Sequence, residues 1–249
     1  MYCEDTRRTR ILLNALDIPS KARLVSLHEH NERAKAQQVV DKLKAGEQVV
    51  VVSDAGMPGI SDPGAELVAV AVAQGCDITV IPGPSAVLGA LVISGLATDR
   101  FVMEGFLPRK GRERRNRLEA LAHEERTTII FESPHRLVDT LQDLADLGDD
   151  QRGVCVVREL TKIHEEVIRG TLRSVGEHFG GGEVRGEIVI VLGGAQPQAA
   201  REVSDAEIRA HLEACVASGM SKRDAASAAA AELKVPRSRA YELASSLTR

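Results

Sequence analysis

Two loops rich in glycine and proline each follow an apolar run that is typical of a strand. SDAGMPGISDPG, residues 53 to 64, follows the valine run 49 to 52, and PGPSA, residues 82 to 86, follows residues 78 to 81. Glycines let a backbone approach a ligand closely, and free N–H groups beside a carboxylate can hold a polar small molecule. Neither loop has Walker A or GxGxxG spacing, so phosphate cradling is not indicated. Both are candidate ligand sites, with simple tight turns as the alternative.

A second candidate is the basic segment RKGRERRNR, residues 109 to 117. It holds six basic side chains against Glu113, a local charge of +5 in a chain whose formal net charge is −4. These side chains are Arg109, Lys110, Arg112, Arg114, Arg115 and Arg117. Such a cluster attracts a phosphate backbone without reading sequence. We predict contact with nucleic acid, the alternative being a solvated loop that leads into a helix.

The histidines and cysteines form no metal-binding pattern. His28 and His30 in HEH lack a third ligand at suitable spacing, and four cysteines lie at least 60 residues apart. We therefore expect no metal, and buried thiols in a reducing cytoplasm. The chain has no Trp, two Tyr and four Phe, which excludes aromatic stacking as the main way of holding a base. No apolar stretch of membrane-spanning length and no signal-type start is present.

The elements that must position these residues begin with a strand and helix alternation. A helix pattern over 31 to 46, capped by Asn31, precedes the valine strand, and another helix pattern covers 65 to 75. The valine run lacks polar alternation, which favours a strand covered on both faces. A second strand over 78 to 81 and a further helix follow. Residues 1 to 98 are therefore predicted to form an α/β domain with right-handed parallel crossovers.

The pattern changes from Arg100 onward. Five strand-like runs follow in close succession, with helices expected over two intervening segments. The strands are expected at 101–107, 127–131, 154–160, 165–172 and 187–194, and the helices at 111–123 and 134–147. Such spacing predicts a second α/β domain, residues 99 to 194, with a mixed, partly antiparallel sheet. We place the domain boundary near residue 98.

A polar linker, residues 193 to 202, leads into a purely helical C-terminal region. Ser204 with Glu207 and Ser221 with Asp224 match the Ser-x-x-acid signal of a helix start. Three short helices are expected in residues 203 to 249, as in a small helix-turn-helix-like module. Such a module could contact nucleic acid or pack on its neighbour.

Six segments together resemble the small-subunit ribosomal RNA methyltransferases, which belong to the tetrapyrrole methylase-like, class III S-adenosylmethionine-dependent methyltransferases. They are CEDTRRTRILL (3–13), VVSDAGMPGISDPGAELV (51–68), VIPGPSAVLGALVISGLATDRFVMEGFLPRKGRER (80–114), TIIFESPHRLVDTL (128–141), VVRELTKIHEEVIRGTL (156–172) and GEIVIVLGG (186–194). The resemblance runs in order over nearly the whole chain. It implies two α/β domains with S-adenosylmethionine folded into the cleft between them, and a helical C-terminal module.

The resemblance also implies a reaction and a partner. A homodimer would methylate a ribose 2′-hydroxyl of a cytidine in 16S ribosomal RNA within the assembled small subunit, so RNA becomes the expected partner of the basic segment. Carried over by motif position, the cofactor-binding residues would be Asp54, Ala55, Gly56, Met57, Ser85, Ala86, Ser133 and Glu187. The same fold also methylates tetrapyrroles, which leaves a small-molecule methyltransferase as an alternative.

One departure from the family concerns the N-terminus. Its members begin with a strand and a loop ahead of the CEDTR segment, whereas here Met1 and Tyr2 stand where that strand should be ending. We therefore expect either a true start site upstream of Met1 or a form that lacks the family's first strand, and the loop after that strand is the one that lines the cofactor cleft. That expectation keeps a catalytically idle RNA-binding form open as a further alternative.

Methyl transfer from a sulfonium to an alcohol is an in-line displacement. The site must hold oxygen, methyl and sulfur collinear and help the hydroxyl to lose its proton. Candidate catalytic side chains lie at or just past predicted strand ends, and they are Glu104, Glu132, His135, Glu159 and Lys162. For each one alone, a salt-bridged or solvent-facing position is the alternative.

Overall fold

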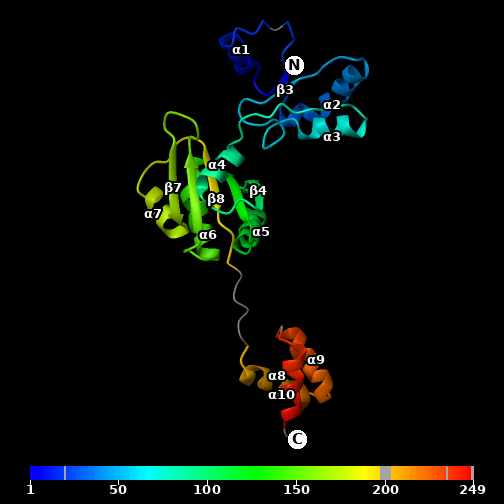
Figure 1. Cartoon of the computed structure of the whole chain (residues 1–249), viewed down its shortest axis with the longest axis vertical. Helices are drawn as coiled ribbons and strands as arrows, with labels where there is room; N and C mark the ends of the chain where they lie inside the picture. Colours follow the sequence, from blue (N-terminus) through cyan, green and yellow to red (C-terminus); the bar gives the residue numbers. More distant parts are fainter. Residues whose placement is uncertain (20, 197–202, 234, 248–249) are drawn as a thin grey trace. The chain divides into compact units, whose positions relative to one another are not determined.

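A computed structural model describes residues 1–19, 21–196, 203–233 and 235–247 (Figure 1). The chain divides into two compact units, Met1–Ala195 and Gln196–Arg249. The first unit contains a three-stranded and a five-stranded sheet with their helices, and the described part of the second is helical. The predicted α/β class with a helical C-terminal part is thereby confirmed. Residues 197–202 of the predicted linker lie outside the described residues.

The three-stranded sheet is parallel and has the order β2-β1-β3. Its strands are Tyr2–Cys3 (β1), Val25–Ser26 (β2) and Val51–Val52 (β3), and its helices are Thr6–Ala15 (α1), Glu29–Lys44 (α2) and Ala65–Ala73 (α3). Helices α2 and α3 pack side by side (Figure 1). Tyr2, Leu27, Val39 and Leu67 form the small core of this part. The sheet is parallel, as expected for this part, but its strands β1 and β2 were not among the predicted strands.

Of the two strands predicted in this part, one is shorter than expected and the other is absent. The valine run contributes only Val51 and Val52 to β3, and Val50 is 50% exposed. Residues 78 to 81 form no strand, and Ile81 is 83% exposed. Strand β3 lies at the edge of its sheet, and no strand of the described residues pairs with its outer side. Because a strand needs a neighbour to satisfy its backbone groups, apolar content alone does not produce one.

The helix expected from Asn31 begins two residues earlier. Helix α2 starts at Glu29 with His28 as its N-cap. Asn31 occupies the third helical position, where its Oδ1 accepts a hydrogen bond from His28 N at 3.0 Å. Asn31 therefore still satisfies a free N–H group at the helix start, from inside the helix.

The five-stranded sheet has the order β4-β5-β8-β6-β7. Its strands are Phe101–Phe106 (β4), Thr127–Glu132 (β5), Gly153–Arg158 (β6), Glu166–Thr171 (β7) and Ile188–Leu192 (β8). Strands β4 and β5 are parallel and the other neighbours antiparallel, which confirms the expected mixed sheet. Its helices are Gly111–Ala122 (α5), Leu137–Leu147 (α6) and Leu172–Gly180 (α7), with a 3-10 turn at Pro134–Arg136 (η1).

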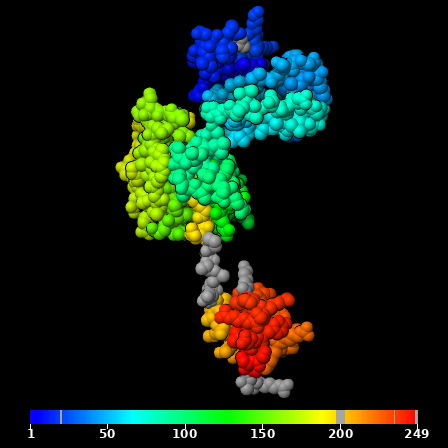
Figure 2. All heavy atoms as spheres, in the orientation of Figure 1, coloured from blue at the N-terminus to red at the C-terminus, as the bar shows by residue number. Residues whose placement is uncertain are grey.

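Both faces of this sheet are covered. Ile130 packs with residues of α5, α6 and α7 on one face, whereas its neighbour Ile129 packs with α4 (Ala86–Ser94) on the other. Helix α4 contacts β6 and β8, and Figure 2 shows the part of the chain near residue 90 lying over the residues that follow it in the first unit. Side chains alternate between the two faces along a strand, so odd-numbered and even-numbered residues of β5 pack against different helices. The domain boundary expected near residue 98 stays a prediction.

The helical unit contains Asp205–Ala217 (α8), Lys222–Glu232 (α9) and Arg237–Ser246 (α10). Ser204 and Ser221 cap α8 and α9 by accepting hydrogen bonds from Glu207 N and Asp224 N, as predicted. Ile208 and Leu212 pack against small alanines of α9 and α10, which lets the helices approach closely. In neither unit does a described helix have the length and apolar character needed to cross a membrane.

Candidate active site

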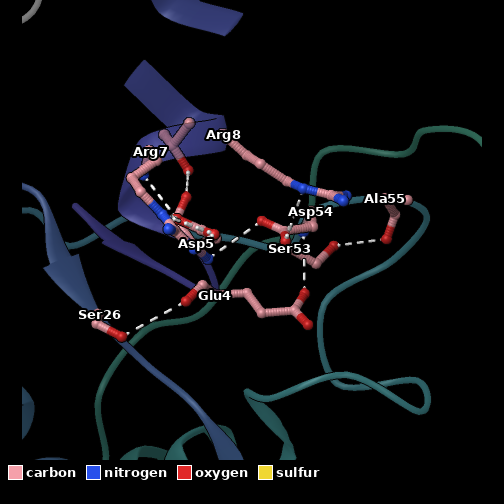
Figure 3. A network of polar contacts seen from close by, with 9 residues as sticks. Glu4, Asp5, Arg7, Arg8, Ser26, Ser53, Asp54 and Ala55 are labelled. Carbon is pink, nitrogen blue, oxygen red and sulfur yellow. Dashed lines mark hydrogen bonds and ion pairs between the residues drawn. The ribbon is translucent and has the colours of Figure 1, made fainter. Parts of the chain in front are cut away.

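The carboxyl ends of β1 and β3 carry the first candidate site (Figure 3). Asp5 N donates to Asp54 Oδ1 at 3.1 Å, and Asp54 N donates to Glu4 Oε2 at 3.1 Å. The two strand ends are thus tied by reciprocal backbone to side-chain bonds. Parallel neighbours place their following loops at the same sheet edge, where ligands bind in open α/β sheets.

The charges at this edge are mainly negative. Asp5 caps α1, and its hydrogen bonds with the Arg7 side chain lower its pKa to about 2. Burial, with the charges of Glu4 and Asp54, instead raises the pKa of Asp62 to about 6. We name Glu4, Asp54 and Asp62 the acidic cluster. Arg8 Nε lies 3.7 Å from Asp54 Oδ2, but this arginine is largely exposed and contributes little neutralisation. The cluster therefore favours a cationic ligand.

Glu32 of α2 sets the shape of the loop after β3. This buried carboxylate accepts hydrogen bonds from Gly64 N at 3.0 Å and Leu67 N at 2.8 Å. These N–H groups belong to the start of α3, where free donors and the helix dipole favour a carboxylate. Gly64 has φ of 135°, a conformation that side chains disfavour. Sequence reasoning missed Glu32, because nothing local marks a bond across 32 residues.

The predicted cofactor residues fall on several elements. Asp54, Ala55, Gly56 and Met57 lie in the loop after β3, where Ser53 Oγ donates to Ala55 O at 2.9 Å. Ser85 is the N-cap of α4, and Ala86 is its first residue. Ser133 follows β5 and Glu187 precedes β8. In the described ranges no hydrogen bond or ion pair joins the first loop to the other residues, and their roles stay predictions. A Cβ added at Gly105 in β4 would lie 3.9 Å from Ser61 Oγ of that loop.

Three predicted residues meet at one end of the five-stranded sheet. Glu159 Oε1 accepts from Lys162 Nζ at 2.9 Å and from Glu187 N at 2.8 Å. Lys162 Nζ also lies 3.1 Å from Glu187 Oε1. A Cβ added at Gly186 would lie 2.5 Å from Glu159 Cγ, so the close approach requires glycine there.

The ion pairs among Glu159, Lys162 and Glu187 make these side chains less suitable for proton transfer. The hydrogen bond with Lys162 lowers the pKa of Glu159, and the same bond raises the pKa of Lys162. A carboxylate of lowered pKa is a weaker base, and an ammonium of raised pKa stays charged at neutral pH. The arrangement is better suited to binding a polar group than to removing a proton from a hydroxyl.

The remaining catalytic candidates differ in exposure. Glu104 lies at an irregularity of β4, where its Oε1 accepts from Arg117 Nε at 2.6 Å. His135 is exposed in η1, and histidine is the commonest general base in enzymes. Glu132 is buried at the end of β5. Their catalytic roles stay predictions.

The basic segment divides into engaged and free side chains. Arg114 pairs with Asp143 at 2.7 Å, and Arg117 pairs with Glu104. The other four basic side chains of the segment are exposed and have no hydrogen-bond or ion-pair partner among the described residues. They are Arg109, Lys110, Arg112 and Arg115. These exposed cations are the ones available to phosphates.

The HEH motif belongs to the start of α2. Asn31 Nδ2 lies 2.7 Å from His28 Nε2, so His28 takes part in capping. Within the described ranges there is no group of three or more His, Cys, Asp or Glu side chains that could hold a metal ion.

The parallel strand ends, the glycine-rich loop and the mixed second sheet agree with a known family. Residues 1–176 match the family described as Tetrapyrrole (Corrin/Porphyrin) Methylases. The chain belongs to this family and is a methyltransferase. Solved structures with the same fold include a cobalt precorrin-4 methyltransferase, at TM-score 0.55 and 19% identity over 77% of this chain and 82% of that one. A diphthine synthase matches at TM-score 0.57 and 15% identity over 78% of each chain.

Named relatives are considerably more similar in sequence. A protein of Synechocystis sp. is 44% identical over 96% of this chain and 85% of its own length. One of Mycobacterium tuberculosis is 48% identical over 92% and 78%, and one of Bacillus subtilis is 37% identical over 96% and 82%. All three are named Ribosomal RNA small subunit methyltransferase I.

Proposed function

We propose that this enzyme transfers a methyl group from S-adenosylmethionine to the ribose 2′-hydroxyl of a cytidine in 16S ribosomal RNA. The observation that carries the proposal is the shared name of relatives that are 37 to 48% identical over most of both chains. The basic segment has four exposed cations that are unpaired among the described residues, which supports a polyanionic substrate. We further propose a homodimer that acts on the assembled small subunit without a metal. A ribosomal substrate would place it in the cytoplasm.

The acidic cluster fits the proposed cofactor. S-adenosylmethionine supplies an electrophilic methyl group on a sulfonium, and it also carries an ammonium. Asp54 and Asp62 would hold these positive parts, and the loop N–H groups beyond Asp54 would meet its polar atoms. Burial is the main cause of the raised pKa of Asp62, and repulsion from Glu4 and Asp54 adds to it; a bound cation would relieve this repulsion.

Cofactor affinity should therefore depend on pH through Asp62. Because its pKa is raised to about 6, Asp62 is protonated in weak acid and gains its charge as pH rises. Affinity for S-adenosylmethionine, measured by calorimetry from about pH 5 to about pH 7, should rise with a midpoint near 6. The raised pKa of Asp62 has its full stabilising effect on the fold below the ordinary value of 3.8, and this effect is lost as the pH rises past 6. Tighter cofactor binding at higher pH would therefore not result from a more stable fold. If the affinity of the Asp62→Asn variant rose with pH in the same way, Asp62 would not be the group responsible.

The free cations of the basic segment should each contribute to RNA affinity. Arg115→Gln should weaken binding of a 16S ribosomal RNA transcript and reduce the slope of log K against log salt by roughly 0.7 to 0.9, because one phosphate contact is lost. Filter binding over a salt series measures this slope. Arg185→Gln, an exposed arginine paired with Glu183, is the matched control and should leave the slope unchanged. Equal slopes for both variants would argue against RNA contact by the segment.

Methyl transfer itself tests the proposed function. Small subunits from a strain lacking this activity would be incubated with the protein and radiolabelled S-adenosylmethionine, and the RNA digested to nucleosides. Label in 2′-O-methylcytidine of 16S RNA is the expected result. No label in subunits or naked 16S RNA would contradict the proposal. Label in an added tetrapyrrole instead would favour the small-molecule enzyme, and cofactor binding without any transfer would favour the idle RNA-binding form.

A further inference from the structure

A buried polar network lies between β5 and α6. It contains Glu132, Thr140, Arg114 and Arg136, and we refer to these residues as the Glu132 network. Thr140 Oγ1 donates to Glu132 Oε2 at 2.8 Å, and Arg136 Nη2 lies 2.5 Å from Glu132 Oε1. The Glu132 side chain is 0% exposed. Its carboxylate therefore has no surface to offer a substrate hydroxyl, although it is one of the catalytic candidates.

Strand parity explains why Glu132 points inward. It has the same parity as Ile130, which packs in the core beneath α5, α6 and α7, and it pairs with Ile188 of β8. Thr140 is fully buried in α6 near Leu137 and Leu141 of that core. A buried carboxylate persists only when hydrogen bonds and a counter-charge offset its desolvation, and Thr140 and Arg136 supply them.

The two arginines of the network hold the start of the basic segment. Arg136 Nη1 donates to Leu107 O at 3.1 Å, and Arg114 Nη1 donates to Pro108 O at 3.4 Å. Arg114 Nη2 also donates to Thr140 Oγ1 at 3.1 Å. Both carbonyls come immediately before Arg109, so the network ties the backbone from which the free cations project. A hollow of about 320 Å³ beside it is lined by Arg109, Arg114 and Arg136, among others.

Helix α5 also carries both a paired arginine and exposed ones. Arg114, Leu118 and Leu121 follow the i, i+4, i+7 spacing of one helix face, and the two leucines are buried. The Arg114 side chain is only 11% exposed and pairs with Asp143. Arg112 and Arg115 lie on other faces of α5 and are exposed. Fixing Arg114 therefore orients Arg112 and Arg115 toward solvent.

We propose that Glu132 and Thr140 are positioning residues for RNA binding, which act through Arg114 and Arg136 on the basic segment. Arg109, Lys110, Arg112 and Arg115 then meet the RNA, while the charges of Arg114 and Arg136 are balanced by Asp143 and Glu132. A segment that is already ordered loses less conformational freedom when RNA binds. This inference rests on the proposed function, since it assumes that the substrate is RNA.

Thr140→Val tests the inference because valine keeps the shape of threonine and removes the hydroxyl. The variant should bind a 16S ribosomal RNA transcript about threefold to tenfold more weakly, since the segment must then be ordered on binding. Trypsin should cleave faster after Arg109, Lys110 and Arg112, while affinity for S-adenosylmethionine stays unchanged. Thr140→Ser restores the hydroxyl and should restore both RNA affinity and the slow cleavage.

Thr127→Val is the matched control. Thr127 is also buried in this sheet region, but its Oγ1 has no hydrogen-bond partner among the described residues, so its loss should change neither readout. If Thr140→Val does not fold, Arg114→Lys replaces it. Lysine keeps the charge but lacks the guanidinium fork, so it should also bind RNA more weakly and be cleaved faster.

The outcomes separate the two proposals. Wild-type affinity and wild-type cleavage in the folded network variant would overturn the positioning role while the proposed function stands. If the wild-type protein binds no RNA, the proposed function fails. Trypsin cleavage would then still show whether the network orders the segment, and unchanged cleavage would overturn that part as well.

Discussion

Replacing Asp54 by Asn should weaken S-adenosylmethionine binding about ten- to hundredfold, measured by calorimetry. The substitution removes a negative charge opposite a ligand that carries a sulfonium and an ammonium, and one charge-assisted hydrogen bond contributes roughly 1.5 to 3 kcal/mol. Folding should change little. Asparagine keeps the Oδ1 that accepts from Asp5 N, and the 3.7 Å pair with Arg8 is largely exposed. RNA affinity should stay the same, because the basic segment acts through phosphates.

Asp77→Asn is the matched control for this variant. Asp77 is exposed beyond α3 and has no hydrogen-bond or ion-pair partner in the described part of the chain, so its loss should leave cofactor affinity unchanged. Normal cofactor binding by Asp54→Asn together with easy unfolding would show that Asp54 only ties the ends of β1 and β3. In that case the loop after β3 would be a structural turn.

Replacing Glu32 by Ala should lower the free energy of unfolding by roughly 2 to 4 kcal/mol, because two N–H groups at the buried start of α3 lose their charged acceptor. Urea unfolding followed by circular dichroism measures the loss. Cofactor affinity should fall too, since the same contacts shape the loop that carries Asp54. Glu32→Gln retains an oxygen acceptor and should lose about half as much.

Glu29→Ala in the first turn of the same helix is the control for Glu32. Glu29 is exposed and should cost only a few tenths of a kcal/mol through its interaction with the helix dipole. Equal losses for Glu29→Ala and Glu32→Ala would mean that the carboxylate at residue 32 contributes only helix propensity. The loop would then owe its shape to its glycines alone.

The sequence was sufficient to predict an element where the residues that form the motif also bond to each other. Ser204 and Ser221 cap helices through bonds that reach three residues, so their spacing predicted them. The strands of the second sheet could be read from their apolar runs, since each finds a paired neighbour in the structure. Residues 78 to 81 have a similarly apolar run, but no strand of the described part of the chain pairs with them, so the strand predicted there is wrong.

The two candidate sites depend on longer contacts. The sequence by itself determined the family, the glycine-rich loop with Asp54, and the basic segment, because these are contiguous motifs. Only the tertiary structure decided that Glu32 holds this loop and that Glu132 faces the core. It also separated Arg114, which pairs across 29 residues with Asp143, from the exposed Arg115 beside it. The physical reason is that burial and hydrogen-bond partners come from packing of distant segments, which residue type and spacing do not specify.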